Sequence, residues 1–201
     1  MSTINGNVCV VNGVAVDKVF SDGKQVYGRN YYQQNRPAQV ITLPNSTYKP
    51  IFTWPNTDCP NGFKLTGAQD NTGIVRFNNL ITGNGLWTVS FWMRNNQRSL
   101  QYLTLDACDL SPVKLFTSND DTWRKYIYTV NITNHSTTYN FVDFKNMSWA
   151  YFLVKDFKVE AGNVATDWTP APEDVLKGYI AAPKNLKATV IDLSTEKLDW
   201  E

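Results

Sequence analysis

The chain has 201 residues, 42% of them hydrophobic, and its 19 basic and 18 acidic residues leave a formal net charge of +1. This length and apolar content suffice for one buried core with short additional segments. The balanced charge, without a basic cluster, argues against nucleic-acid binding. Aromatic residues are abundant at 13%, whereas helix-forming residues seldom recur at helical spacing, a balance that predicts an all-β protein.

The cysteines and the N-terminal residues indicate in which cellular compartment the protein is expected. Cys9, Cys59 and Cys108 are far apart and odd in number, which argues against a disulfide framework and against a cysteine zinc site. The first residues lack the basic segment and apolar run of a signal peptide. No stretch approaches the roughly 18 consecutive apolar residues of a membrane span. We therefore expect neither signal-dependent export nor membrane insertion.

Residues 8–28 are predicted to form a small β-hairpin. Its turn is the tetrapeptide at 21–24, Ser-Asp-Gly-Lys, in which Asp-Gly suits the positive φ angles of a type I′ turn. The residues expected to flank the turn are Val14, Val16, Gln25 and Val26. Because an isolated hairpin is marginally stable in water, this one is expected to pack on the following domain or on a neighbouring subunit. The alternative is a strand pair that merely extends the sandwich.

The region from residue 38 to residue 174 contains short β-like runs separated by turn-rich stretches, the spacing typical of a sandwich. The predicted strands are residues 40–43, 62–65, 73–77, 86–94, 100–105, 113–116, 123–132 and 151–160.

Two of these strands alternate clearly between their faces. In one, the apolar set is Trp87, Val89, Phe91 and Met93, and the opposite set is Thr88, Ser90, Trp92 and Arg94. In the other, the set Tyr126, Tyr128, Val130 and Ile132 opposes Lys125, Ile127, Thr129 and Asn131. We expect one face of each strand to lie in the core and the other to be open to solvent or ligand.

A strand and a domain are predicted to end shortly after residue 160. Gly162 and Asn163 indicate a turn, and Pro170 and Pro172 lack the amide donors that a further ladder would need. Trp168 can close the end of a sandwich.

Residues 158–174, K-V-E-A-G-N-V-A-T-D-W-T-P-A-P-E-D, resemble a known closing motif. It is the K-x-E-x-G-x-x-A-T-x-W-x-P-A-P-E-D ending of jelly-roll, carbohydrate-binding-like domains in tail and baseplate proteins of siphophages that infect Gram-positive bacteria. The sequence Gly28-Arg29-Asn30 is similar to the opening of the same domains, with Tyr31-Tyr32 in place of the usual apolar pair. The resemblance implies an attachment hairpin at residues 1–28 and a jelly-roll β-sandwich at residues 29–174.

Residues 175–201 are predicted to be a linker followed by a short β segment. Residues 181–190 and 198–201 resemble the first two strands of a fibronectin type III domain, whose second strand commonly ends in a core tryptophan, here Trp200. Two strands cannot bury a sandwich core. Either the domain is truncated, or these strands pair with something else.

Enzyme chemistry finds little support in the residues. His135 is the one histidine, too few for a histidine zinc centre, and no serine lies in a G-x-S-x-G elbow. A glycosidase needs two opposed carboxylates roughly 5 to 9.5 Å apart. The neighbouring acids, Asp106 with Asp109 and Asp120 with Asp121, fall in turn-rich stretches instead. No catalytic residue is predicted, and the chain is expected not to be an enzyme.

Sugar binding requires aromatic faces for a pyranose ring and planar polar groups for its hydroxyls. Trp92 lies beside Arg94 on the polar side of its predicted strand, and Lys125 would be a neighbour if the two alternating strands are adjacent. Trp54 offers a second stacking surface in the segment 50–60. The alternative is that this segment covers Trp92. Four other tryptophans are interpreted as structural, namely Trp87, Trp123, Trp149 and Trp168.

The resemblance also implies a structural calcium ion near an end of the jelly roll. Glu160 is the matching acidic position, and Asp143 or Asp156 could assist. Calcium takes six to eight oxygen ligands, many of them backbone carbonyls, so the sequence does not define the remaining ligands.

From the resemblance we expect a virion protein, made in the bacterial cytoplasm and released at lysis, that binds host cell-wall polysaccharide without cleaving it. Other tail or baseplate subunits would be its partners, in several copies. The alternative is a structural tail or baseplate protein whose jelly roll only contacts neighbouring subunits. A groove shared by Trp92 and Trp54 would favour the first; burial of both would favour the second.

Overall fold

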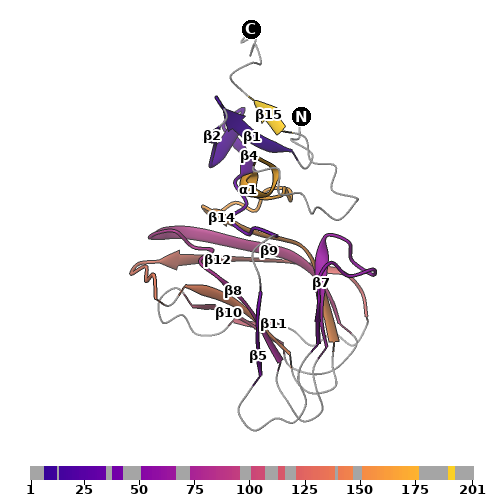
Figure 1. Cartoon of the computed structure of the whole chain (residues 1–201). Helices are drawn as coiled ribbons and strands as arrows, with labels where there is room; N and C mark the ends of the chain where they lie inside the picture. The colour runs from indigo at the N-terminus through magenta and orange to yellow at the C-terminus, as the bar shows by residue number, and fades with distance from the viewer. Residues whose placement is uncertain are drawn as a thin grey trace.

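Two five-stranded antiparallel sheets pack face to face in the computed structural model, which describes residues 7–12, 14–34, 38–42, 51–66, 73–95, 101–106, 113–115, 121–138, 140–146, 151–176 and 190–192 (Figure 1). The β8 sheet has the order β11 (Val113–Leu115), β10 (Gln101–Asp106), β13 (Phe141–Asn146), β8 (Gly73–Asn78) and β5 (Gln39–Thr42). The β9 sheet has the order β12 (Arg124–Ile132), β9 (Gly85–Asn95), β14 (Tyr151–Ala161), β7 (Gly62–Thr66) and β6 (Ile51–Thr53). The predicted all-β sandwich is confirmed.

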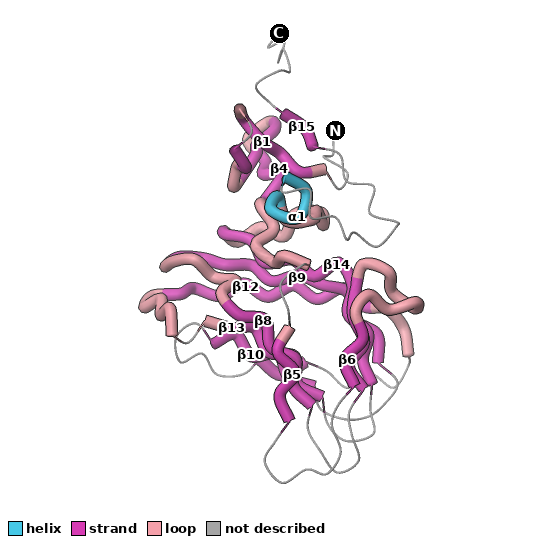
Figure 2. The backbone as a smooth tube through the Cα atoms, viewed as in Figure 1, coloured by secondary structure: helices cyan, strands magenta, loops and turns pink. Residues whose placement is uncertain are grey.

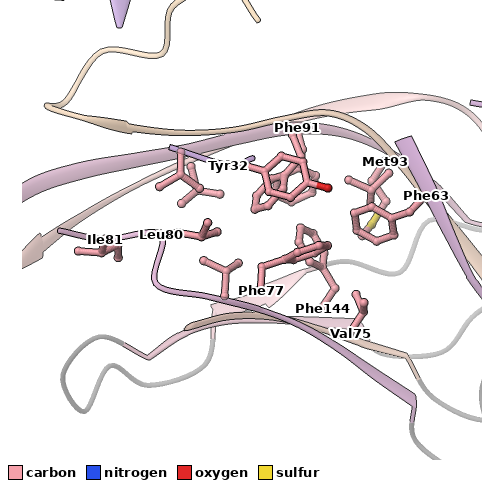
Figure 3. Close-up of a cluster of buried hydrophobic side chains, with 14 of the residues drawn as sticks. Tyr32, Phe63, Val75, Phe77, Leu80, Ile81, Phe91, Met93 and Phe144 are labelled. Atoms are coloured by element: carbon pink, nitrogen blue, oxygen red, sulfur yellow. The ribbon is translucent and has the colours of Figure 1, made fainter. Parts of the chain in front are cut away.

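The core between the sheets is dominated by aromatic rings (Figure 3). Phe144 of the β8 sheet meets Phe63, Phe91 and Phe157, with ring centroids 5.2 to 5.4 Å apart. Edge-to-face contacts of this kind add to the stabilisation from buried apolar area. The inward sets predicted for β9 and β12 are confirmed: the β9 set is buried, and that of β12 is half-buried or buried.

The outer face of β9 is only half open. Thr88 and Ser90 are 0% and 4% exposed, whereas Trp92 and Arg94 remain half-exposed. In Figure 1, the N-terminal strands and α1 (Pro172–Leu176) lie on this outer side of the β9 sheet. The expectation of an open outer face is thus wrong for Thr88 and Ser90, because the segments before and after the sandwich pack there.

The hairpin turn is confirmed. Ser21 of β3 (Lys18–Ser21) is paired with Lys24 of β4 (Lys24–Gly28), and Asp22 and Gly23 have φ angles of 51° and 71°, as a type I′ turn requires. The flanking residues differ from the prediction, since Phe20 lies opposite Gln25.

Val14 and Val16 belong to another pairing. β2 (Val14–Ala15) pairs with β1 (Val8–Val11), and the Val16 amide donates to the Cys9 carbonyl over 3.2 Å. Residues 8–28 therefore form two short antiparallel strand pairs, β1 with β2 and β3 with β4, rather than one hairpin.

The first and the last described strands meet in one small sheet of order β15-β1-β2. β15 (Val190–Asp192) pairs in parallel with β1, with Val8 opposite Val190. β15 shares only residue 190 with the fibronectin-like segments, so its pairing with β1 does not decide between the two alternatives for them. Most of the fibronectin-like segments, at 181–189 and 198–201, lie outside the described residues.

α1 connects the sandwich to this region (Figure 2). The helix includes Val175 and Leu176, which the sequence predicts to be part of a linker. In the part of the chain that the structure describes, no helix has the length and apolar character of a membrane span.

Candidate functional site

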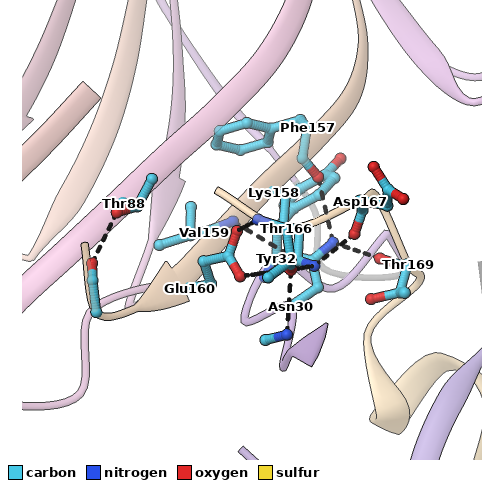
Figure 4. A network of polar contacts seen from close by, with 12 residues as sticks. Asn30, Tyr32, Thr88, Phe157, Lys158, Val159, Glu160, Thr166, Asp167 and Thr169 are labelled. Atoms are coloured by element: carbon cyan, nitrogen blue, oxygen red, sulfur yellow. Dashed lines mark hydrogen bonds and ion pairs between the residues drawn. The ribbon is translucent and has the colours of Figure 1, made fainter. Parts of the chain in front are cut away.

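A buried ionic cluster joins the two segments that carry the family resemblance (Figure 4). The Lys158 ammonium lies 3.7 Å from the Glu160 carboxylate, and both side chains are 0% exposed. Thr166 donates to Glu160 twice, from its amide over 2.9 Å and from its hydroxyl over 2.7 Å. The Thr166 hydroxyl also accepts hydrogen bonds from Lys158 and from the Gly28 amide. A Cβ at Gly28 would overlap a Glu160 oxygen, so a larger residue there would displace the Glu160 carboxylate from these contacts.

The Asn30 side chain completes the connection. Its amide group donates to the carbonyls of Phe157 and Thr169, and its oxygen accepts from the amides of Tyr32 and Val159. Asn30 is 1% exposed, and buried polar groups need such partners. The opening and closing motifs therefore fit together as one structural unit, and their residues serve the fold.

The acidic residues predicted to hold calcium do not fit that role. Both Glu160 oxygens accept bonds from Thr166. Asp143 lies in the other sheet, where its two oxygens bind Arg76 over 2.8 and 2.7 Å. Asp156 lies at a bulge of β14 with φ 53°, and burial raises its pKa, which disfavours the charged form. Among described residues, no group of three or more His, Cys, Asp or Glu could hold a metal ion.

The ionic cluster predicts a pH dependence of stability. Burial lowers the pKa of Lys158 from 10.5 to about 8, so the folded protein releases this proton at a lower pH than the unfolded chain. The free energy of unfolding should therefore rise by about 1–2 kcal/mol between roughly pH 8 and pH 10. Above about pH 10 half-buried tyrosines reverse the trend, because partial burial raises the pKa of Tyr31 and Tyr128 to about 12.

Urea unfolding at several pH values, for the wild type and Lys158→Met, measures this effect. The variant should lack the rise between pH 8 and pH 10, because methionine carries no titrating group. Parallel curves for the two proteins would contradict the assignment of the rise to Lys158.

The open half of the β9 sheet presents aromatic and cationic side chains together. Trp92 is paired in register with Lys125 on one side and with Lys155 on the other. The Lys155 ammonium lies 6.0 Å from the centroid of Trp92 and 4.5 Å from that of Trp123. We call Trp92, Trp123, Lys125 and Lys155 the Trp92 face. The predicted adjacency of Trp92 and Lys125 is confirmed.

Sequence reasoning missed Lys155 and interpreted Trp123 as structural. Both could have been found from strand alternation, because Lys155 lies in a predicted strand and Trp123 is two residues before Lys125. What the sequence lacked was the strand order, which places β9 between β12 and β14.

Arg94 lies on the same face, two residues beyond Trp92, and is engaged with Asp121. Its Nε and Nη2 atoms donate to the two carboxylate oxygens over 2.8 and 3.1 Å, and this pairing raises the pKa of Arg94. A bidentate pair of this kind fixes the guanidinium plane. Arg94 therefore lies at the border of the Trp92 face with its charge already balanced.

Trp54 is not part of the Trp92 face. It packs inward against the core, with its ring 6.1 Å from Tyr32 and 6.2 Å from Phe63. Trp92 lies on the outer surface of the same sheet, so the structure does not bring the two indoles into a common groove. Of the other tryptophans, Trp87 is 3% exposed, in the core as expected; Trp168 is half-buried. Trp149 lies outside the described residues.

His135 is more enclosed than its turn-like sequence suggested. It is half-buried, and its Nε2 lies 2.9 Å from the Ile81 carbonyl and 3.3 Å from the Asn140 amide. These contacts are those of a residue that joins two loops. Asp109 and Asp120 lie outside the described residues.

Comparison with known proteins gives remote structural similarities alone. No protein-family model and no curated protein sequence matches the chain. The structure of TmCBM61 in complex with beta-1,4-galactotriose is similar with a TM-score of 0.46 and 12% identity, over 67% of this chain and 100% of that one. A mutant of CBM29-2, a family 29 carbohydrate-binding module, complexed with mannohexaose has a TM-score of 0.42 and 12% identity, over 69% of this chain and 97% of its own.

A further similarity is to the enzymatically active domain of the bacteriophage CBA120 tailspike protein 4. Its TM-score is 0.45 at 10% identity, and the match covers 62% of this chain but 19% of the tailspike chain. A function for the present chain must therefore be argued from its own residues.

Proposed function

We propose that this protein is a non-catalytic saccharide-binding component of a phage tail or baseplate and that it binds host cell-wall polysaccharide through the Trp92 face. The observation that carries the proposal is the half-exposed indole of Trp92 on an outer sheet surface, held in register between two lysines. An indole offers the flat apolar surface on which the C–H side of a sugar ring stacks.

The lysines supply the polar part of the recognition. Each ammonium has three donors, suited to sugar hydroxyls or to the anionic groups of wall polymers. Because they lie on β12 and β14, on either side of β9, they flank a sugar stacked on Trp92. Single sites of this kind are weak, and several copies on one virion would raise the avidity through effective concentration.

Replacing Trp92 with alanine should weaken binding to purified wall polysaccharide at least about tenfold, since the lost apolar contact is worth roughly 1.5–3 kcal/mol. The melting temperature should change by at most a few degrees, because a half-exposed side chain contributes little to the core. Binding is measured with fluorescently labelled protein that is assembled into a multivalent probe and added to a panel of Gram-positive strains. Calorimetry measures stability.

Leu86→Ala is the matched control. Leu86 is 44% exposed on the same strand, toward its other end, and its loss should leave binding unchanged. If Trp92→Ala unfolds the protein or binds as well as the wild type, the Trp92 face is not the site.

The structural alternative has an observation of its own in its favour. Val14 and Phe20, on the small N-terminal strands, are 68% and 58% exposed, and exposed apolar side chains suit a contact with another subunit. The absence of binding to every strain and polysaccharide, with multivalent display, would favour a protein that only joins its neighbours in the tail.

A further inference from the structure

A cavity of about 630 Å³ opens at one end of the sandwich, away from the Trp92 face. It lies between the segment at the end of β8 and the connection from β12 to β13. Six polar side chains line it, namely Asn78, Asn79, Thr82, His135, Thr137 and Asn140. Its apolar wall includes Phe77 and Leu80, which reach into the core cluster (Figure 3).

The two walls of the cavity are fastened to each other. The Asn140 side chain is 6% exposed and makes two hydrogen bonds to the main chain of Ile81. Its Oδ1 accepts from the Ile81 amide over 3.2 Å, and its Nδ2 donates to the Ile81 carbonyl. The Asn140 carbonyl accepts from the Asn79 amide over 2.8 Å, and the His135 amide donates to Asn84 over 2.6 Å. A cavity with walls held in this way loses little conformational entropy when it binds a ligand.

The chemistry of the lining is neutral. No Asp, Glu, Lys or Arg is among its residues, so a charged ligand would lose hydration without gaining a partner. Amide and hydroxyl groups both donate and accept hydrogen bonds, which matches a ring of hydroxyls. Asn78 and Thr137 are exposed at the cavity. Asn79 has a φ of 57°, a left-handed conformation that in asparagine is found at turns and functional sites.

We propose that this cavity is a second binding site, which takes one neutral sugar residue, such as the terminal or branch unit of a polysaccharide. The volume lies within the roughly 300–1,000 Å³ of small-molecule sites. The exposed polar groups of Asn78 and Thr137 match the hydroxyls of a pyranose. Phe77 is 3% exposed and belongs to the core, so it closes the cavity without offering a face for stacking.

The cavity is separate from the Trp92 face. Lys125 pairs with Trp92 near one end of β12, and Ile132 pairs with Gly85 near the other. Seven residues of strand correspond to roughly 23 Å, so the two sites can be disabled independently.

The test is ligand-detected NMR on the full chain with galactose, glucose, N-acetylglucosamine and mannose. Concentrations up to about 10 mM detect dissociation constants in the millimolar range. We expect the wild type to bind at least one of these sugars and the double variant Asn78→Ala/Thr137→Val to bind it at least about tenfold more weakly, because two hydrogen-bonding groups are lost. Trp92→Ala should bind that sugar as the wild type does.

Asn134→Ala/Thr138→Ala is the matched control. It also removes one asparagine and one threonine side chain, from exposed positions of the connection between β12 and β13 that are outside the cavity lining. Its binding should equal that of the wild type. Thermal melting checks that both double variants are folded, and Thr137→Val alone, which preserves side-chain shape, should still weaken binding. Failure to bind any sugar of the panel, or a loss caused by Trp92→Ala and not by the cavity variants, would overturn the proposal.

Discussion

Replacing Glu160 with alanine is expected to lower the free energy of unfolding by about 3–5 kcal/mol, the typical cost of removing one partner from a buried ion pair. The variant leaves the Lys158 ammonium fully buried, with Thr166 and the Asp167 carbonyl as its remaining partners. It also leaves the Thr166 amide without its acceptor. Chemical denaturation at pH 7 measures the loss.

Two further variants make this result specific. Asp121→Ala also removes a carboxylate from an ion pair, but that pair is exposed, so it should cost no more than about 1 kcal/mol. Adding Lys158→Met to Glu160→Ala should recover part of the stability, because an apolar replacement of a buried pair is often neutral. A loss below about 1 kcal/mol for Glu160→Ala would show that the cluster does not hold the two motifs together.

The Gly62→Ala substitution is expected to cost about 2–4 kcal/mol, because the added methyl group would overlap main-chain atoms of β14. A Cβ at this position would overlap the Val154 carbonyl oxygen and lie 2.8 Å from the Lys155 Cα. Backbone in the middle of a sheet cannot move aside as the end of a side chain can. β7 and β14 must therefore separate near the bulge, and thermal melting should show a clear decrease.

Gly83→Ala is the matched control, since a Cβ there meets no atom within 4 Å and the change should be within about 1 kcal/mol. Equal stabilities of Gly62→Ala and the wild type would mean that β7 approaches β14 less closely than described.

The parts of the fold that follow from local pattern were predicted. Alternation set the inward faces of β9 and β12, and Asp22-Gly23 set the hairpin turn. β6 escaped prediction because three residues between prolines give too short a pattern. β13 was missed although Val142 and Phe144 alternate with Asp143 and Lys145, because the alternation covers only these few residues and Phe141 breaks it. The parallel pairing of β15 with β1 joins residues about 180 apart, and no local pattern encodes it.

The candidate site was predictable in part for the same reason. Trp92 and Lys125 lie on strands, where alternation fixes the side-chain direction once the strands are adjacent. Trp54 follows a short edge strand, and its direction depends on how that segment folds against Tyr32. Glu160 was assigned to calcium because the motif marks an acidic position, but its partners, Lys158 and Thr166, were in the same motif. The charge of a buried carboxylate can be balanced by a buried lysine two residues away, without a metal ion.

The pairing of β15 with β1 also has a mechanical consequence. The two strands run in parallel, so tension that pulls Val8 and Asp192 in opposite directions would load their ladder in shear, with the pairs Val8–Val190, Cys9–Ile191 and Val10–Asp192 sharing the force. The small sheet, and not the sandwich, would be the first element to bear that tension. The Trp92 face, which lies on the sandwich, would then keep its shape while the small sheet is stretched.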